Sequence, residues 1–240
     1  RQPVKVGAPV SDVTAGLLAA MGISAAYAHK LQTGEGQKVD TSLFEAAIIQ
    51  TYWQSAIAFA TGTTPDPMGS AHPLNAPYQA FQTKDGWINI GAANQKNWEK
   101  FIQLIDAEHL QQDPKFSANS DRMKNRLELE QQLNTILSQK NTADWLEVFE
   151  GGGLPAGPVL SITQMHQDPQ TIAREMVPTV THPVAGKVQT IGLPVKFSET
   201  PGGVKSPAPL LGQHTSEVLA ELGYSESQIE AMLKAGSMSE

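Results

Sequence analysis

A long run of small and apolar residues dominates the first part of the chain. Its hydrophobic spacing predicts a helix over residues 12–32, with Gly34 and Gly36 following where such a helix would stop. The apolar positions of this run are Val13, Leu17, Leu18, Met21, Ile23, Ala25, Ala26 and Tyr27. Because they cover most of the circumference, we expect a buried helix rather than a surface helix. Ser11 and Asp12 are both placed to cap it.

The next apolar run predicts a second helix of about 18 residues that opens at Ser42. Ser42 and Glu45 have the spacing of a capping box, in which each residue satisfies a backbone N–H at the helix start. A glycine and two prolines in residues 61–67 favour a loop, so we expect the helix to end there.

The middle of the chain mixes strand-like and helix-like patterns. Lys84–Gly86 is typical of a hairpin turn between the extended segments "YQAFQT" and "WINIGA". Helical spacing follows over residues 95–106, 118–138 and 141–149. The glycines at 151–153 favour a helix end and a loop that enters an extended segment.

The last third returns to short elements. Asp168 and Pro169 have the arrangement of a helix cap and first helical residue. Residues 177–198 look like strands, and "ETPGGVKSPAP" looks like a linker. Two terminal helices are predicted in "HTSEVLAEL" and "SESQIEAMLK", the second opened by a Ser225–Gln228 capping box.

Composition narrows the possible functions. The 240 residues suffice for one large domain or two smaller ones, and the absence of cysteine excludes disulfides and thiolate chemistry. A net charge of −7 with scattered lysines and arginines argues against a nucleic-acid partner. No apolar run of about 18 residues is free of polar interruption, and no signal-peptide pattern opens the chain. We therefore expect no membrane segment, a cytoplasmic protein, and a small molecule or a second copy as partner.

Candidate chemistry reduces to one carboxylate. The six histidines lack metal-ligand spacing, so no metal site is expected, and "TGEGQKVDTS" lacks the phosphate-loop spacing. Asp12 stands before the first helix, where a carboxylate is usually a structural cap. The same position suits an ionised nucleophile or base, because free N–H groups there can receive a developing oxyanion. The pattern leaves both roles open.

The stretch "SDVTAGLLAAMGISAAYAHKLQTGEGQKVDTSLFEAA" resembles the segment around the catalytic aspartate of family III CoA-transferases, the CaiB–BaiF family. The resemblance continues in order through "GSAHPLNAPYQAFQTKDGWINIGAANQKNW", "GLPAGPV", "DPQTIARE", "LPVKFSETP" and "APLLGQHTSEVLAELGYSESQI". It therefore covers essentially the whole chain.

The resemblance implies an α/β fold combined with an α+β domain. Residues 1–60 and 190–240 would form part of a Rossmann-like large domain, and residues 70–165 a smaller α+β domain. Residues 61–69 and 166–189 would be linkers between them. Family members form interlocked homodimers and carry an N-terminal Rossmann-like region before the aspartate. The resemblance thus implies that an N-terminal half is missing from this chain.

The resemblance also implies a reaction. Asp12 would attack an acyl-CoA to form a mixed anhydride and then an aspartyl-CoA thioester, from which a second acid takes the CoA. CoA and acyl-CoA would be substrates together with carboxylic acids, with no tightly bound cofactor. Lys38 and Leu43 fall in a stretch that lies near CoA in relatives, although a solvated lysine and a core leucine are alternatives. The set Gly69, Ser70 and His72 would line the acyl pocket, or belong to a plain linker turn.

Two alternatives remain. An α-methylacyl-CoA racemase of the same superfamily uses an aspartate at this position, but racemases tend to carry a glutamate after the second strand. This chain has Asn94 and Gln95 there, which favours the transferase. If the chain is incomplete, it could instead be a non-catalytic binding or oligomerisation module.

Overall fold

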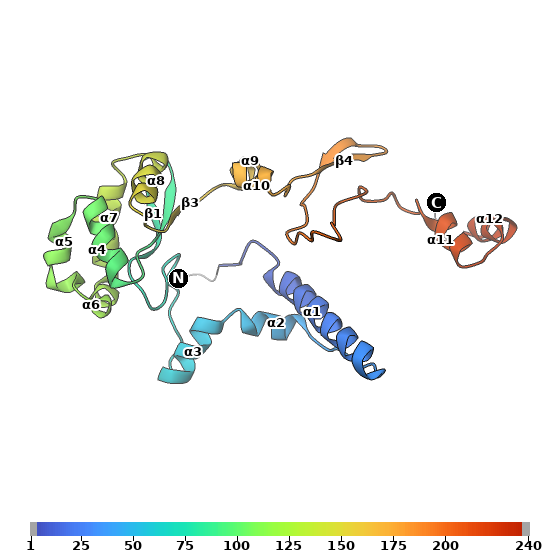
Figure 1. The fold of residues 1–240 in the computed structure, drawn as a ribbon, viewed down its shortest axis with the longest axis horizontal. Coiled ribbons are helices and arrows are strands. Elements are labelled where there is room, and N and C mark those ends of the chain that lie inside the picture. The colour runs from blue at the N-terminus through green and yellow to red at the C-terminus, as the bar shows by residue number, and fades with distance from the viewer. Residues whose placement is uncertain (1–3, 237–240) are drawn as a thin grey trace. The chain divides into compact units, whose positions relative to one another are not determined.

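The structure is a computed structural model that describes residues 4–236 of the chain. It divides into two compact units, the first ending at Val159 and the second beginning at Leu160. Each is a mixture of helices with a small antiparallel sheet (Figure 1). Three helices open the first unit, namely α1 (Val10–Thr33), α2 (Leu43–Ile49) and α3 (Tyr52–Thr61).

Helix α1 begins earlier than the sequence predicts. Pro9 is the N-cap residue, and its carbonyl oxygen accepts a hydrogen bond from the Val13 N–H at 3.0 Å. The prediction that Ser11 or Asp12 caps the helix is therefore wrong, because the first turn is already formed ahead of them. Asp12 lies inside that turn, and no side chain caps the helix. The predicted end is confirmed at Gly34, which takes a left-handed conformation.

The prediction that α1 is buried is also wrong for the described chain. None of its residues is buried, and Leu17 and Leu31 are 66% and 70% exposed. Helix α2 packs against α1, and Gln50 Nε2 donates a hydrogen bond to Thr14 Oγ1 at 2.8 Å. The apolar residues of α1 indicate that most of its surface is suited to burial. Within the described residues, only part of that surface is covered.

In length and composition alone, α1 would also pass as a membrane-crossing helix, contrary to the sequence expectation. The helix has 24 residues, and an 18-residue window within it has a mean hydropathy of 1.3. None of the residues in that window is buried. A core helix of a globular protein has the same composition, so the pattern does not distinguish the two.

The second predicted helix is two helices. Ser42 caps α2 as expected, because its hydroxyl oxygen accepts from the Glu45 N–H at 3.2 Å. The prediction of one continuous helix is wrong, because the chain breaks at residues 50–51 before α3. There the Thr51 hydroxyl donates to the Ile48 carbonyl oxygen at 2.7 Å, a local bond that competes with the helical ladder.

The rest of the first unit surrounds a three-stranded antiparallel sheet in the order β1-β2-β3. Its strands are β1 (Tyr78–Gln82), β2 (Trp87–Gly91) and β3 (Ala156–Pro158). Its helices are α4 (Gln95–Leu104), α5 (Glu108–Gln112), the 3₁₀ turn η1 (Pro114–Phe116), α6 (Asn119–Lys124), α7 (Arg126–Leu137) and α8 (Thr142–Gly151). The predicted hairpin is confirmed, with Tyr78 opposite Gly91. The helical spacing over residues 118–138 belongs to two helices that meet at Asn125.

The core of this unit lies between the sheet and the helices. Alternate residues of β1 and β2 point into it, as the two-residue period of a strand requires. Its largest fully buried side chains include Phe81, Ile88, Ile90, Trp98, Phe101, Ile102, Leu110, Phe116, Leu129, Leu133 and Phe149. Phe101 is central, because its ring contacts both Trp98 and Phe149, with centroids 6.4 and 5.8 Å away.

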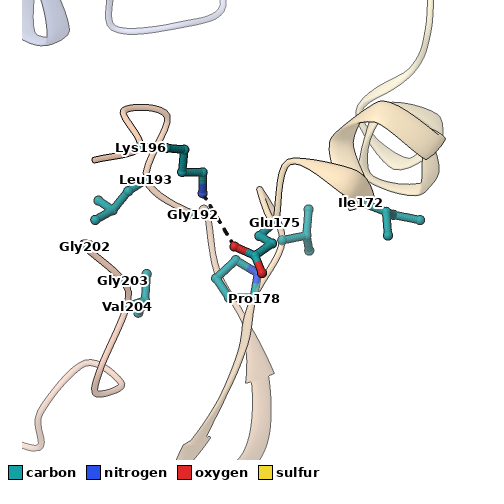
Figure 2. Close-up of a pocket in the computed structure, with 10 residues that line it drawn as sticks. Ile172, Glu175, Pro178, Gly192, Leu193, Lys196, Gly202, Gly203 and Val204 are labelled. Carbon is teal, nitrogen blue, oxygen red and sulfur yellow. Dashed lines mark ion pairs between the residues drawn. The ribbon is translucent and has the colours of Figure 1, made fainter. Parts of the chain in front are cut away.

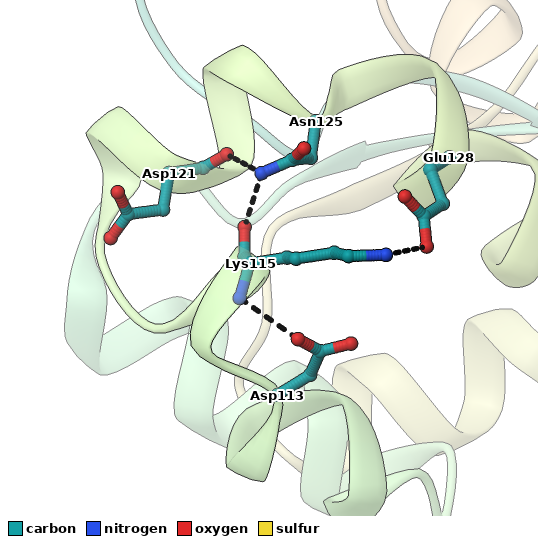
Figure 3. Close-up of polar contacts among 5 residues, drawn as sticks. All are labelled: Asp113, Lys115, Asp121, Asn125 and Glu128. Atoms are coloured by element: carbon teal, nitrogen blue, oxygen red, sulfur yellow. Dashed lines mark hydrogen bonds and ion pairs between the residues drawn. The ribbon is translucent and has the colours of Figure 1, made fainter.

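Polar contacts tie the surface turns to this core. Figure 3 shows Lys115 in η1, whose Nζ pairs with Glu128 of α7 at 2.7 Å. The Lys115 backbone N–H donates to Asp113 at 2.9 Å, and Asn125 donates to the Lys115 carbonyl oxygen at 3.2 Å. The Glu128 carboxylate, which accepts from Lys115, raises the pKa of the lysine. These contacts fix η1 against the junction of α6 and α7.

Within the described residues, the second unit buries fewer hydrophobic side chains than the first unit. It contains α9 (Ile162–Gln167), α10 (Pro169–Ala173), β4 (Thr179–His182), β5 (Gly186–Gln189), α11 (Thr215–Glu221) and α12 (Glu226–Lys234). Asp168 caps α10 as predicted, and Ser225 and Gln228 form the predicted capping box of α12. Within its described residues, the buried hydrophobic side chains are Leu219 and Ile229.

Truncation of Phe101 to alanine should destabilise the first unit by about 3–5 kcal/mol, because it removes a fully enclosed ring and leaves a cavity. Urea denaturation followed by tryptophan fluorescence measures the loss. Phe59→Ala is the matched control, since Phe59 is 89% exposed and its loss should change the free energy of unfolding little. Equal effects of the two substitutions would contradict the assignment of the core.

Replacement of Asp85 by asparagine should lower stability at neutral pH and make stability less sensitive to acid. The backbone N–H and the hydroxyl of Thr142 donate to the Asp85 carboxylate at 2.7 and 2.9 Å and hold its pKa below the usual 3.8. A depressed pKa gives stability that is present above the unfolded value and is lost as the pH falls through the folded value.

The urea midpoint of wild type should therefore approach that of Asp85→Asn as the pH is lowered through and below 3.8. Asp66→Asn, in the exposed loop after α3, serves as the control and should show no such convergence. A gap that stays constant down to the lowest pH would argue against the Thr142 contacts as its source.

Candidate active site

Asp12 lies in the first turn of α1, exposed to solvent. Within residues 4–236 its carboxylate makes no hydrogen bond or ion pair, and the Ser11 and Asp12 backbone N–H groups have no partner. The positive end of the helix dipole favours an ionised carboxylate at this position. Asp12 therefore does not serve as the N-terminal cap of α1, which was the structural alternative to a catalytic role.

Lys38 lies in the connection between α1 and α2, and Leu43 lies at the start of α2. Lys38 Nζ pairs with Asp40 at 2.8 Å, and both side chains are largely exposed. Leu43 is the first residue of α2 and is also exposed. No hydrogen bond or ion pair within the described residues joins either residue to Asp12.

Gly69, Ser70 and His72 are brought together in one segment, residues 68–77, which we term the 68–77 loop. Gly69 has a φ of 69°, which turns the chain back toward β1. The Ser70 hydroxyl oxygen accepts a hydrogen bond from the Ala80 N–H at 3.1 Å. The His72 N–H donates to the Tyr78 carbonyl oxygen at 2.9 Å. The loop is therefore pinned along β1 rather than free to swing.

The His72 ring lies in an aromatic cluster that sequence reasoning missed. It stacks on Tyr78 with ring centroids 5.1 Å apart and planes 4° apart. The Trp53 ring of α3 meets it edge to face at 5.3 Å. Its Nδ1 accepts a hydrogen bond from the Leu74 N–H at 3.1 Å, so a neutral ring carries its proton on Nε2. His72 is thus a hydrogen-bond donor of fixed orientation.

Two residues of α6 hold the C-terminal end of the 68–77 loop. The Ala76 N–H donates to Asn119 Oδ1 at 3.1 Å, and Asn119 Nδ2 donates to the Leu74 carbonyl oxygen at 2.9 Å. Arg122 Nε donates to the Ala76 carbonyl oxygen at 2.6 Å. The sequence carried no signal for either contact, because an arginine within a short helix is normally solvated.

The Arg122 guanidinium is completely buried. Its Nη1 donates to the carbonyl oxygens of Phe116 and Ser117 at 2.9 and 3.2 Å and to Gln95 Oε1 at 3.2 Å. The group lies over the Trp98 ring, 4.8 Å from its centroid. Burial lowers the pKa of Arg122, and the charges of Asp121 and Glu99 oppose that shift. Arginine nevertheless stays charged, so this is a buried cation held mainly by carbonyl groups and an aromatic face.

Asn94 and Gln95 both have structural contacts. Asn94 Oδ1 accepts from the Asn97 N–H at 2.8 Å and caps α4, while Gln95 accepts from Arg122. Neither position presents a carboxylate. Across residues 4–236 no group of three or more histidine, aspartate or glutamate side chains gathers in a way that could hold a metal ion.

Arg122→Lys should destabilise the first unit by about 1–3 kcal/mol, because lysine cannot reach the Ala76 and Phe116 carbonyl oxygens together and leaves buried acceptors unpaired. Amide hydrogen exchange at His72 should accelerate along with it. Arg174→Lys, at an exposed position of the second unit, is the control. Unchanged stability and exchange in Arg122→Lys would show that the loop is held by other contacts.

Comparisons with known proteins agree with the sequence resemblance. A family model described as CoA-transferase family III matches residues 1–215. The chain is similar to succinyl-CoA:glutarate CoA-transferase of Mus musculus, with 34% identity over 235 residues, which are 98% of this chain and 54% of that protein. It is also 34% identical to acetyl-CoA:oxalate CoA-transferase of Acetobacter aceti over 212 residues, 85% of this chain and 53% of that protein.

A solved structure gives the same result for the fold. A CAIB/BAIF family protein from Brucella suis matches with a TM-score of 0.76 and 32% identity over 92% of this chain and 57% of that chain. The chain thus spans about half the length of the curated relatives it matches.

Proposed function

The chain belongs to CoA-transferase family III, and from this membership we propose that it carries the nucleophile of an enzyme that moves CoA between carboxylic acids. The activity is proposed for the protein that contains the whole family fold, since the chain spans about half the length of its curated relatives. Asp12 is the proposed nucleophile. The observation that carries this proposal is its carboxylate, which is unpartnered in the described chain and lies at the positive end of a 24-residue helix.

The proposed reaction exchanges one activated acyl bond for another. The Asp12 carboxylate attacks the thioester carbonyl of the donor acyl-CoA, which forms a mixed anhydride and expels CoA thiolate. The thiolate then attacks the aspartyl carbonyl, releases the donor acid and leaves an aspartyl-CoA thioester. An incoming acid repeats the two steps in reverse order, which yields a new acyl-CoA and frees Asp12.

Backbone donors near Asp12 support this chemistry. The Ser11 and Asp12 N–H groups have no partner within the described residues, and such groups stabilise the negative charge that develops on a carbonyl oxygen. The helix dipole acts in the same direction, because it favours negative charge near the first turn. We propose that these donors hold the oxyanion of each tetrahedral intermediate.

The substrates are proposed to be short dicarboxylic acids and their CoA thioesters. The two curated relatives described above are named for glutarate and oxalate, both dicarboxylates. We assign the acyl pocket to Gly69, Ser70 and His72, where the His72 Nε2–H is a fixed donor for the second carboxylate. Lys38 is proposed to attract the CoA phosphates, with Leu43 beside it on the apolar part of CoA.

The domain arrangement follows the same proposal. Residues 1–60 and 190–240 would belong to a Rossmann-like large domain and residues 70–165 to the small α+β domain, with residues 61–69 and 166–189 as linkers. The enzyme is proposed to act in the cytoplasm as an interlocked homodimer. Asn94 caps α4, and Gln95 accepts a hydrogen bond from Arg122. Because neither residue supplies a carboxylate, the two support a transferase over an α-methylacyl-CoA racemase.

Asp12→Asn should lower CoA transfer from succinyl-CoA to glutarate by about 10⁴-fold or more, because the amide removes the nucleophile and keeps the size of the side chain. The thermal midpoint should change little, since loss of an exposed carboxylate charge from the first turn of a helix costs only about 0.3–1 kcal/mol. The assay uses the protein that contains the whole family fold, and Asp66→Asn is the control. Trapping with hydroxylamine should leave a hydroxamate on the Asp12 peptide of wild type alone. Full transfer activity in Asp12→Asn would refute the assignment.

A further inference from the structure

The second unit contains a cavity of about 440 Å³ (Figure 2). Its wall is formed by the end of α10 and the residues after it, and by residues 192–204, which follow β5. The volume falls within the range of roughly 300–1,000 Å³ that small-molecule sites occupy. All lining residues belong to the second unit, so the cavity is formed within one compact part of the chain.

The two walls of the cavity are held in close contact. The Gly192 N–H donates to the Met176 carbonyl oxygen at 2.9 Å. A Cβ at position 192 would collide with the Glu175 carbonyl oxygen, so only glycine allows the two segments to approach this far. Glu175 itself has a φ of 53°, in the left-handed region that costs a non-glycine residue conformational energy. The cavity is therefore a built feature rather than a gap between loose loops.

The cavity is lined by one lysine, one glutamate and several apolar side chains. Lys196 Nζ faces the Glu175 carboxylate across the opening at 4.0 Å (Figure 2). The Lys196 side chain is 35% exposed, whereas that of Glu175 is 84% exposed. The lysine is thus half enclosed by the wall, while its partner stands in solvent at the limit of an ion pair and holds it weakly.

Further donors and apolar groups line the same space. The backbone N–H groups of Gly202, Gly203 and Val204 make no hydrogen bond within the described residues. Backbone N–H groups without a partner can donate to an anion that enters the cavity. Ile172 and Leu193 supply apolar contacts on the lining.

We propose that this cavity binds a small aliphatic carboxylate, whose anionic group replaces Glu175 as the partner of Lys196 while its chain lies against Leu193. The exposed Glu175 carboxylate marks the position that the ligand oxygen takes. A carboxylate fits better than a compact, fully polar anion because part of the lining is apolar. All residues that form this site belong to the second unit, and the proposal does not invoke Asp12.

The test follows hexanoate binding by the amide resonances of Gly192, Gly202 and Gly203 in the ¹⁵N-labelled 240-residue chain. Saturable shifts of these signals are expected in wild type. Lys196→Met should weaken binding about 10-fold or more, the effect of losing a hydrogen bond to a charged group. Glu175→Gln should instead tighten binding roughly two- to fivefold, because it removes the competing carboxylate. The opposite directions are the signature of displacement.

Matched controls separate this proposal from a structural ion pair. Lys187→Met, on exposed β5, should leave the hexanoate affinity unchanged. In wild type, hexan-1-ol and inorganic phosphate should each bind at least about 10-fold more weakly than hexanoate, since each lacks one half of the complementarity. These two measurements need no variant and so do not depend on variant folding.

Four results would overturn the proposal. They are an absence of saturable shifts in wild type, weaker binding in both Glu175→Gln and Lys196→Met, equal affinity for hexanoate and hexan-1-ol, and phosphate binding as tight as that of hexanoate.

Discussion

The buried guanidinium of Arg122 is the contact on which the arrangement of the first unit most depends. It has no carboxylate partner in the described chain, so backbone carbonyl oxygens and the Trp98 ring must compensate its desolvation. Those oxygens belong to Ala76, before β1, and to Phe116 in η1. One cation therefore joins the start of the sheet to the helical side of the core.

This clamp has a consequence for the 68–77 loop. Because Ala76 is fixed by Arg122 and Asn119, the residues before it can fold back along β1 only in a narrow range of paths. The His72 ring then lies on Tyr78 with its orientation set, and its Nε2–H makes no hydrogen bond within the described residues. A rigid support for a candidate binding loop is what a specific site requires, since misplaced donors contribute little to recognition.

Helix α1 presents the opposite situation. Its apolar side chains would each gain roughly 1.5–3 kcal/mol on burial, yet α2 covers only part of them. A carboxylate as solvated as Asp12 in this chain is a weak nucleophile, and water would compete for any anhydride that it formed. The proposed chemistry therefore needs further protein over this surface, which agrees with a chain that spans about half the length of its curated relatives.

The sequence by itself determined the features that depend on near neighbours. The caps at Ser42, Asp168 and Ser225 and the hairpin turn at Lys84–Gly86 were predicted correctly, because each rests on bonds within a few residues. The ordered motifs around Asp12 also identified the family, since they are read from the chain alone.

Only the tertiary structure decided what depends on distant partners. The burial of Arg122 follows from carbonyl groups of segments that no local pattern connects to it. The surface of α1 stays exposed because an apolar pattern indicates that a face needs burial but does not supply the segment that covers it. Hydrophobic periodicity fixes which face of an element is apolar, whereas the partner of that face is set by packing.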